Sequence, residues 1–245
     1  MNHYEKLCEI KKLTDKIGKI YGTEDFAIYL YSIIKMSKPN TVVELGTGLG
    51  TTALWSALAL EENDRGMLYT VDDGSEWGDL VLAEDSFKEY FHPVYSDYIK
   101  NLIEHFQFTN IKFINERINA GSLSNIDILF SDYQHSPHAV LSCFANYFGR
   151  MSDNSHIFID SASTYYPSYL VLENLIEMLN QRQIPQTLME MVPITQAEKF
   201  REKVYNSKFQ LTHIIENKDR PQNSTAHIKI IPKDIFPQPR IGIRF

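Results

Sequence analysis

The sequence has little cysteine, no long basic run and no long apolar segment. Only Cys8 and Cys143 occur among 245 residues, which excludes a CxxC metal or redox pair and gives no support for a disulfide framework. No run of Lys or Arg exceeds two and the net charge is −7, so we expect no nucleic-acid partner. Apolar runs fall short of a membrane span, and Glu5 and Glu9 stand where a signal peptide would be apolar. We therefore expect a cytoplasmic protein that does not bind a membrane.

The N-terminal residues 1–38 have the spacing of helices. Apolar residues recur at three- and four-residue intervals up to Ile20, and again between Glu24 and Met36 after a break at Gly22 and Thr23. We expect two cap helices that could equally form a homodimer or a surface for another partner. The 43% hydrophobic content is enough for one sizeable core, so residues 1–245 are predicted to form a single domain.

From residue 41 onward, short apolar runs alternate with helical patterns. Strands are expected at Thr41–Leu45, Met67–Val71, Ile111–Asn115, Ile126–Phe130 and His156–Ile159, and helices at Thr51–Leu60, Ser96–Phe106, His138–Phe148 and Ser168–Arg182. This alternation predicts an α/β fold with a Rossmann-like, doubly wound, mostly parallel sheet. Two final β-rich runs, Phe209–Ile215 and Ala226–Ile231, have a turn with Pro221 between them and predict an antiparallel hairpin at the sheet edge.

A glycine turn follows the first predicted strand, in the segment VVELGTGLGTT that starts at Val42. Glycine lets the backbone turn tightly and approach a ligand, and the N-terminus of the next helix suits a carboxylate or phosphate. The G-x-G-x-x-G spacing of dinucleotide sites fails because Thr51 occupies the third glycine position. A turn that only connects strand and helix is the simpler alternative.

Acidic residues end the other predicted strands. Asp72 lies 22 residues after Gly50, where a carboxylate can accept hydrogen bonds from ribose hydroxyls, although Asp73 could be the ligand instead or both could be solvated turn acids. Asp132 and Asp160 also follow apolar runs, so we expect them at the same edge.

These motifs resemble those of class I S-adenosylmethionine (SAM) methyltransferases. The pattern E-x-G-x-G-x-G, from Glu44 to Gly50, is similar to motif I, which holds the methionine part of SAM, and D-x-x-H-S followed by an acid is similar to the small-molecule O-methyltransferases of the catechol and methyltransferase 24 type. The resemblance implies that SAM is the cofactor, that Glu44 supports the turn and the ammonium end, and that Asp132 and His135 are catalytic. The implied cofactor-binding set is Glu44, Gly46, Thr47, Gly48, Gly50, Thr51, Asp72, Asp73 and Asp132.

The same resemblance places His135 where catechol-type enzymes have their base, and a histidine that titrates near neutrality suits that role. A structural histidine at a helix start is the alternative. A metal is not favoured: Asp132 and Asp160 are weak candidate ligands, but Ser161 stands where those enzymes have an amide or acid, and a hydroxyl is a poor replacement.

An aromatic segment lies between the second strand and the next helix. Trp77, Phe87, Tyr90, Phe91, Tyr95 and Tyr98 fall within 22 residues. Residues 73–96 could fold over the open edge as a lid that excludes water, or could simply pack on the N-terminal helices. Tyr133, Tyr165 and Tyr166 are further candidates for a pocket at this edge.

The sequence thus predicts an enzyme that transfers a methyl group from SAM to a hydroxyl of a small metabolite. Three alternatives remain open at this point. The chain could use SAM in another way, such as its intramolecular cyclisation; it could bind SAM without catalysis; or it could be a nicotinamide oxidoreductase, against which Glu44 and Thr51 argue.

Overall fold

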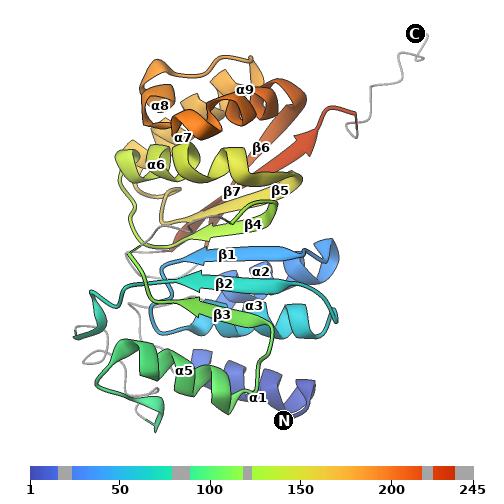
Figure 1. Ribbon diagram of the computed structural model, residues 1–245, viewed down its shortest axis with the longest axis vertical. Helices are drawn as coiled ribbons and strands as arrows, with labels where there is room; N and C mark the ends of the chain where they lie inside the picture. Colours follow the sequence, from blue (N-terminus) through green and yellow to red (C-terminus); the bar gives the residue numbers. More distant parts are fainter. Residues whose placement is uncertain (16–23, 79–88, 118–122, 217–222, 235–245) are drawn as a thin grey trace.

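Seven strands form one sheet among residues 1–15, 24–78, 89–117, 123–216 and 223–234, which the computed structural model describes (Figure 1). Their order is β3-β2-β1-β4-β5-β7-β6. The strands are β1 (Thr41–Leu45), β2 (Met67–Val71), β3 (Ile111–Ile114), β4 (Ile126–Ser131), β5 (Met151–Asp160), β6 (Ser207–Ile215) and β7 (Ser224–Pro232). β1 to β5 are parallel, whereas β7 runs antiparallel to both β5 and β6. The predicted doubly wound sheet is confirmed.

Helices cover both faces of this sheet. They are α1 (His3–Asp15), α2 (Glu24–Ser37), α3 (Thr51–Glu61), α5 (Tyr95–His105), α6 (Pro137–Tyr147), η2 (Phe148–Arg150), α7 (Tyr166–Asn180), α8 (Gln186–Met191), η3 (Ile194–Gln196) and α9 (Ala197–Asn206). One core cluster joins α1, α2, α3 and α5 to the first face, and a second joins α6 to α9 to the other. Each helix in the described residues is too short or too polar to cross a membrane.

The central strands are apolar on both sides because both faces are covered. In β1, Val42, Val43 and Leu45 are all 1% exposed or less, and they divide between the two core clusters. Parallel pairing aligns Leu45 with both Val71 and Ser131, so β1, β2 and β4 end at one edge. The loops that carry chemistry therefore start side by side.

The C-terminal hairpin is confirmed. β7 pairs with β5 from Ser155–Ile230 to Asp160–Thr225, and β6 forms the outer edge. The expected turn with Pro221 lies outside the described residues.

Element boundaries differ from the predicted ones by no more than two residues, apart from β5 and the N-terminal residues, where α1 ends at Asp15 and residues 16–23 lie outside the described part. β5 begins at Met151 rather than at His156, because its polar first residues stay extended beside a register shift in β4. There Ser152 Oγ donates a hydrogen bond to Asp127 Oδ1 at 2.6 Å. α8, η3 and α9 had no counterpart in the sequence prediction.

Candidate functional site

The three glycines of the turn after β1 all have positive φ, but each for its own reason. At Gly46 (φ +92°) an added Cβ would lie 2.4 Å from the carbonyl oxygen of Asp132, so this glycine lets the ends of β1 and β4 approach. At Gly50 (φ +84°) it would lie 2.9 Å from Leu102 Cδ2 of α5. At Gly48 (φ +52°) it would meet no described atom within 4 Å. Gly48 is therefore where the turn is open to a ligand.

Glu44 lies beneath this turn and is only 2% exposed. Thr70 Oγ1 donates to Glu44 Oε2 at 2.5 Å, so Thr47 Oγ1, 2.5 Å from the Thr70 oxygen, donates to Thr70. Burial raises the pKa of Glu44 to about 8; the Thr70 hydrogen bond opposes this rise and the charge of Asp72 adds to it. Glu44 thus supports the turn through two threonine hydroxyls.

Asp72, directly after β2, braces the same turn from the other side. Its Oδ2 accepts the amides of Thr47 and Gly48 at 2.9 and 3.0 Å, and its Oδ1 accepts the amide of Gly74 at 2.8 Å. A carboxylate has about four lone-pair positions. Most of the hydrogen-bonding capacity of Asp72 is therefore taken by the backbone.

Asp73 is the exposed acid of this pair. Its Oδ1 accepts the Ser75 amide at 2.9 Å. Hydrogen bonds from Ser75 lower the pKa of Asp73, and the charge of Arg117 adds to this effect. Asp73 thus presents an ionised carboxylate next to the braced turn.

The helix that follows the glycine turn starts without a side-chain cap. Gly50 is the N-cap residue of α3 and provides no side-chain acceptor. Thr51, the first residue of α3, is 6% exposed, and within the described part of the chain its buried Oγ1 has no hydrogen-bond partner. An unsatisfied buried hydroxyl and an uncapped helix start both favour a bound polar group here.

Two tyrosines of α5 hold the turn from above. Tyr95 Oη donates to the carbonyl of Gly48 and Tyr98 Oη to that of Leu49, both at 2.8 Å. Trp77 packs on them, with its ring centroid 4.4 Å from that of Tyr98 and 5.2 Å from that of Tyr95. These aromatics are core residues that shape the glycine turn.

The predicted lid at residues 73–96 is only partly described, because residues 79–88, including Phe87, lie outside. Tyr90 is buried and donates to Glu9 of α1 at 3.1 Å, as expected for packing on the N-terminal helices. Phe91 is 45% exposed and stacks on Trp77 at 6.0 Å. A lid that covers the crevice stays a prediction.

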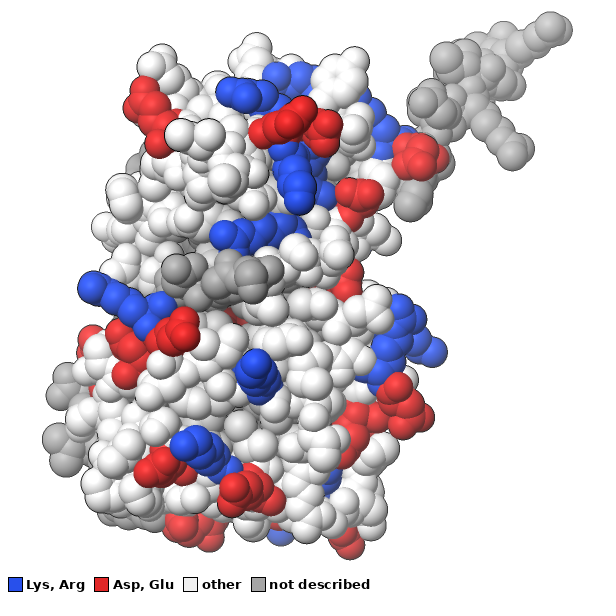
Figure 2. All heavy atoms as spheres, viewed as in Figure 1, with Lys and Arg blue, Asp and Glu red and all other residues white. Residues whose placement is uncertain are grey.

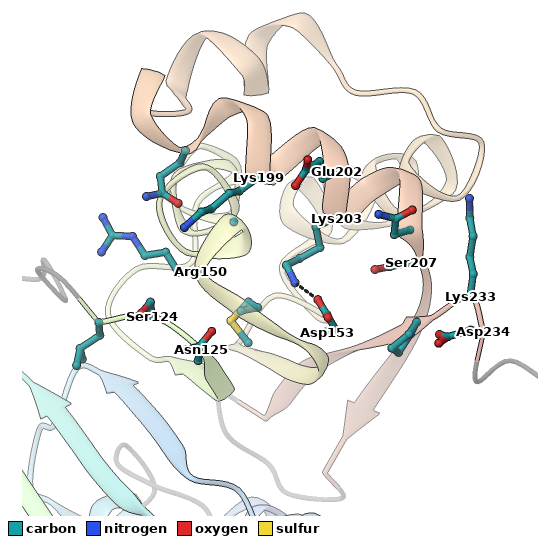
Figure 3. Close-up of a pocket in the computed structure, with 16 residues that line it drawn as sticks. Ser124, Asn125, Arg150, Asp153, Lys199, Glu202, Lys203, Ser207, Lys233 and Asp234 are labelled. Carbon is teal, nitrogen blue, oxygen red and sulfur yellow. Dashed lines mark hydrogen bonds and ion pairs between the residues drawn. The ribbon is translucent and has the colours of Figure 1, made fainter.

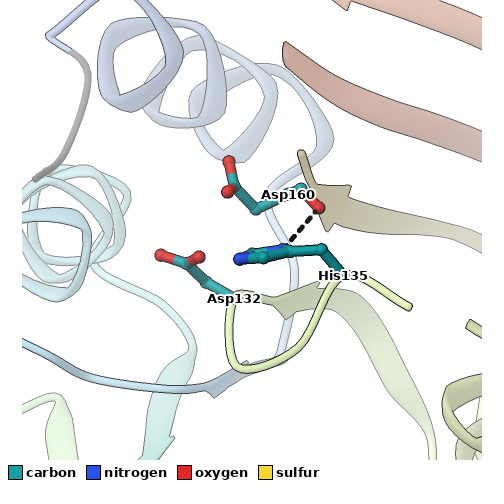
Figure 4. A group of neighbouring side chains, drawn as sticks. All are labelled: Asp132, His135 and Asp160. Carbon is teal, nitrogen blue, oxygen red and sulfur yellow. Dashed lines mark hydrogen bonds between the residues drawn. The ribbon is translucent and has the colours of Figure 1, made fainter. Parts of the chain in front are cut away.

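The ends of β4 and β5 bring together Asp132, His135 and Asp160 (Figure 4). One ligand atom of each lies within 4.8 Å of those of the other two. The Nδ1 of His135 lies 3.1 Å from the backbone oxygen of Asp160 and donates to it, so the neutral ring carries its lone pair on Nε2. Figure 4 shows the other ring nitrogen turned toward Asp132. This arrangement suits a base whose cationic form is stabilised by a carboxylate.

Serines fix the backbone around this group. Ser168 Oγ of α7 donates to the carbonyl of His135, and Ser136, the N-cap of α6, accepts the amide of Ala139 at 3.2 Å. Ser161 has φ +55° and donates through Oγ to Asp160 Oδ2 at 2.7 Å. His135 thus stands directly before a capped helix.

The structure therefore assembles the predicted residues in two adjoining groups. Glu44, Thr47, Gly48 and Asp72 form one, and Asp132, His135 and Asp160 form the other, joined where Gly46 meets the Asp132 carbonyl. The sequence prediction missed Thr70 and the hydrogen bonds of Tyr95 and Tyr98. Thr70, a polar residue one position before the end of an otherwise apolar strand, was the available signal.

Comparisons with known proteins agree with this geometry. Residues 43–162 match the model of a methyltransferase domain (methyltransferase 24). Similar solved structures include a methyltransferase from Geobacter sulfurreducens, with 14% identity, 93% of this chain and 90% of that chain covered, and a TM-score of 0.53. An O-methyltransferase from Bacillus cereus in complex with S-adenosylhomocysteine (SAH) has 11% identity, 92% of this chain and 90% of that chain covered, and a TM-score of 0.52. The O-methyltransferase TomG from Streptomyces achromogenes, involved in tomaymycin synthesis and in complex with SAM, has 11% identity, 91% of this chain and 89% of that chain covered, and a TM-score of 0.50.

Curated proteins give no significant match to the sequence. At identities this low, the solved structures establish the fold, while the family model identifies the domain that contains both groups of site residues. The resemblance seen in the sequence is confirmed. Residues 43–162 of the chain form a methyltransferase domain, on the fold of class I SAM-dependent methyltransferases.

Proposed function

We propose that the protein transfers a methyl group from SAM to a hydroxyl group of a small molecule, with His135 as the base. The observation that carries this proposal is the ring of His135, which is held by the Asp160 carbonyl and faces the Asp132 carboxylate beside the glycine turn. The O-methyltransferases from Bacillus cereus and Streptomyces achromogenes, crystallised with SAH and SAM, support the choice of cofactor and reaction.

The residues present fit SAM. Gly48 leaves space where any side chain would project, and the buried Thr51 hydroxyl needs a partner. The uncapped start of α3 suits the carboxylate of the methionine end, and the carboxylate of Asp72, with that of Glu44 once it ionises near pH 8, favours its positive charges. The ribose hydroxyls bind at the Asp72–Asp73 pair, where Asp73 offers the exposed acceptor because Asp72 is largely occupied by the turn.

SAM supplies an electrophilic methyl carbon on sulfur. When bound, SAM would give its methyl group to the acceptor oxygen and leave as its demethylated sulfide product, and His135 would accept the hydroxyl proton at Nε2. The resulting imidazolium is stabilised by Asp132 and by the Asp160 carbonyl. Tyr165 and Tyr166, 48% and 67% exposed at the start of α7, are proposed to contact the acceptor.

A divalent metal would compete with this role. The donor set of two carboxylates and one imidazole could coordinate a cation, but the metal would then occupy the lone pair that the base needs. Ser161 is a poor third oxygen ligand, and its hydroxyl donates to Asp160. We expect dialysis against a chelator to leave turnover unchanged; a loss of turnover that Mg²⁺ restores would make Asp132 and Asp160 ligands instead.

The test compares His135→Asn with His138→Asn, an exposed histidine in the first turn of α6. Turnover is measured as SAH release with SAM and a panel of hydroxylated small molecules, and SAM affinity by calorimetry. His135→Asn should lower turnover by about 10²–10⁴-fold with SAM affinity within about threefold of wild type, because a positioned base contributes on that scale. Unchanged turnover would refute the base, and a new product from SAM alone would indicate cyclisation.

We further propose that the protein acts in the cytoplasm as a homodimer. The negative net charge and two cysteines are compatible with that compartment, and α1 and α2 offer a surface for a second copy. Cell fractionation and light scattering of the purified chain test the two statements separately.

A further inference from the structure

We propose a second ligand site, for a phosphate-bearing small molecule, in a hollow between α9 and the N-terminal ends of β4 and β5 (Figure 3). The hollow has a volume of about 790 Å³, which is the size of small-molecule pockets in proteins. Its lining includes four cationic side chains: Arg150 of η2, Lys199 and Lys203 of α9, and Lys233 directly after β7. This inference is independent of the proposed methyl transfer.

The hollow lies far from the methyltransferase site. It borders Asn125, directly before β4, and Met151, the first residue of β5, whereas Asp132 and Asp160 stand at the opposite ends of these strands. β5 has 10 residues, so its ends are about 30 Å apart at a rise of about 3.3 Å per residue. A ligand in the hollow cannot be part of the SAM site.

Lys203 is the strongest indication of an anion. The residue is 9% exposed, and its Nζ bonds to Asp153 Oδ1 at 3.1 Å. The side chain of Asp153 is 89% exposed, so solvent weakens this pair. A buried ammonium has three protons to donate and needs more compensation than one solvated carboxylate provides.

Like charges also converge here. Lys199 and Lys203 are one turn apart on α9 and line the same hollow, and this spacing of equal charges is unfavourable in a helix. In Figure 3, Arg150 lies on the same side of the hollow as Lys199. Figure 2 shows basic side chains with acidic ones among them on this end of the molecule, although the chain as a whole is acidic.

The rest of the lining restricts the ligand. Ser124, Asn125 and Asn206 offer neutral donors and acceptors that suit hydroxyl groups, while Glu202 and Asp234 disfavour a highly charged anion. A phosphate monoester on a hydroxylated carbon skeleton fits this combination, since guanidinium and ammonium groups both bind phosphate. Inorganic phosphate shares the charged part of this chemistry but lacks the hydroxyl groups.

Calorimetry with ribose 5-phosphate, inorganic phosphate and ribose tests the site. We expect saturable binding of ribose 5-phosphate, at least tenfold weaker binding of inorganic phosphate, and no detectable binding of ribose. Equal affinity for the two phosphates would overturn the assignment to an organic ligand, and the absence of binding by both would overturn the site.

Substitutions locate the binding. Lys199→Gln and Lys203→Gln should each weaken ribose 5-phosphate binding at least tenfold, whereas Lys112→Gln, an exposed lysine on β3, should change it less than twofold. If Lys203→Gln does not fold, the exposed Lys199 decides alone, and an unchanged affinity there refutes the proposal. Saturating SAH must leave the binding unchanged, because competition would place the phosphate at the glycine turn.

Discussion

Replacing Glu44 with glutamine separates the contribution of this side chain to the methyltransferase site from its effect on the stability of the fold. The carboxyl group is buried under the glycine turn and accepts the Thr70 hydroxyl at 2.5 Å. Glutamine has nearly the same shape and retains an oxygen acceptor, but it carries no charge at any pH. The substitution therefore removes the ionisation and changes little else.

The size of the effect follows from the pKa of Glu44, which burial raises from its ordinary value of 4.5 to about 8. Between these values the unfolded chain releases the proton while the folded chain keeps it, so stability falls as pH rises from 4.5 to about 8. Each pKa unit corresponds to about 1.4 kcal/mol. Relative to pH 4.5, the loss is about 3 kcal/mol at pH 7 and about 5 kcal/mol above pH 8.

The assay is urea unfolding of wild type, Glu44→Gln and Glu116→Gln at pH 5, 7 and 8.5, with SAM affinity measured in parallel. Glu116 is exposed and serves as the control. At pH 5 we expect Glu44→Gln to be as stable as wild type or about 1 kcal/mol less stable, and above pH 8 to be more stable by several kcal/mol. Its SAM affinity should fall. Parallel pH curves for Glu44→Gln and wild type would refute the reasoning.

Further expectations concern stability and the turn. Burial lowers the pKa of His156 to about 3 and that of His227 to about 4, so on acidification the unfolded chain gains protons before the folded chain does. The free energy of unfolding should therefore fall below pH 6.5, by up to about 3 kcal/mol per pH unit for the two histidines together. Unfolding measured across this acid range should show about half that slope in His227→Gln. Gly46→Ala should lower the free energy of unfolding by several kcal/mol, whereas Gly48→Ala should lower it by about 1–2 kcal/mol and mainly weaken SAM binding. Thermal melts and calorimetry measure the two effects, and equal melting temperatures of the two variants would contradict this expectation. Tyr98→Phe leaves a buried carbonyl without its donor and should cost about 1–3 kcal/mol in urea unfolding, so an unchanged midpoint would argue against that hydrogen bond.

The sequence predicts those elements whose burial is simple. β1 and β2 are apolar on both faces, so their patterns mark the strands at the residues where the structure has them. The glycines of the turn and the D-x-x-H segment depend on local backbone geometry, and both lie at the predicted edge. The order of residues around the end of a strand is enough to predict the glycine turn and the D-x-x-H segment.

Hydrogen-bond partners distant in sequence were not predictable in the same way. That Asp72 binds ribose stays a prediction; the three backbone amides that it accepts in the structure are set by the three-dimensional path of the turn. α9 buries Phe200 and Val204 among charged residues, too few apolar positions to give a helical pattern by inspection. In the aromatic segment at residues 73–96, rings that pack in the core and rings that could form a lid look the same in the sequence.

The close approach of Gly46 to the main chain of Asp132 has a consequence for how new acceptor preferences could arise in this protein. The turn after β1 and the end of β4 meet with no room for a side chain at Gly46, so we expect them to move together. We expect variation that selects a different acceptor to be better tolerated at the exposed Tyr165 and Tyr166, proposed above to contact the acceptor, because they lie away from this contact. A library directed at these two tyrosines would explore substrates without dismantling the chemistry.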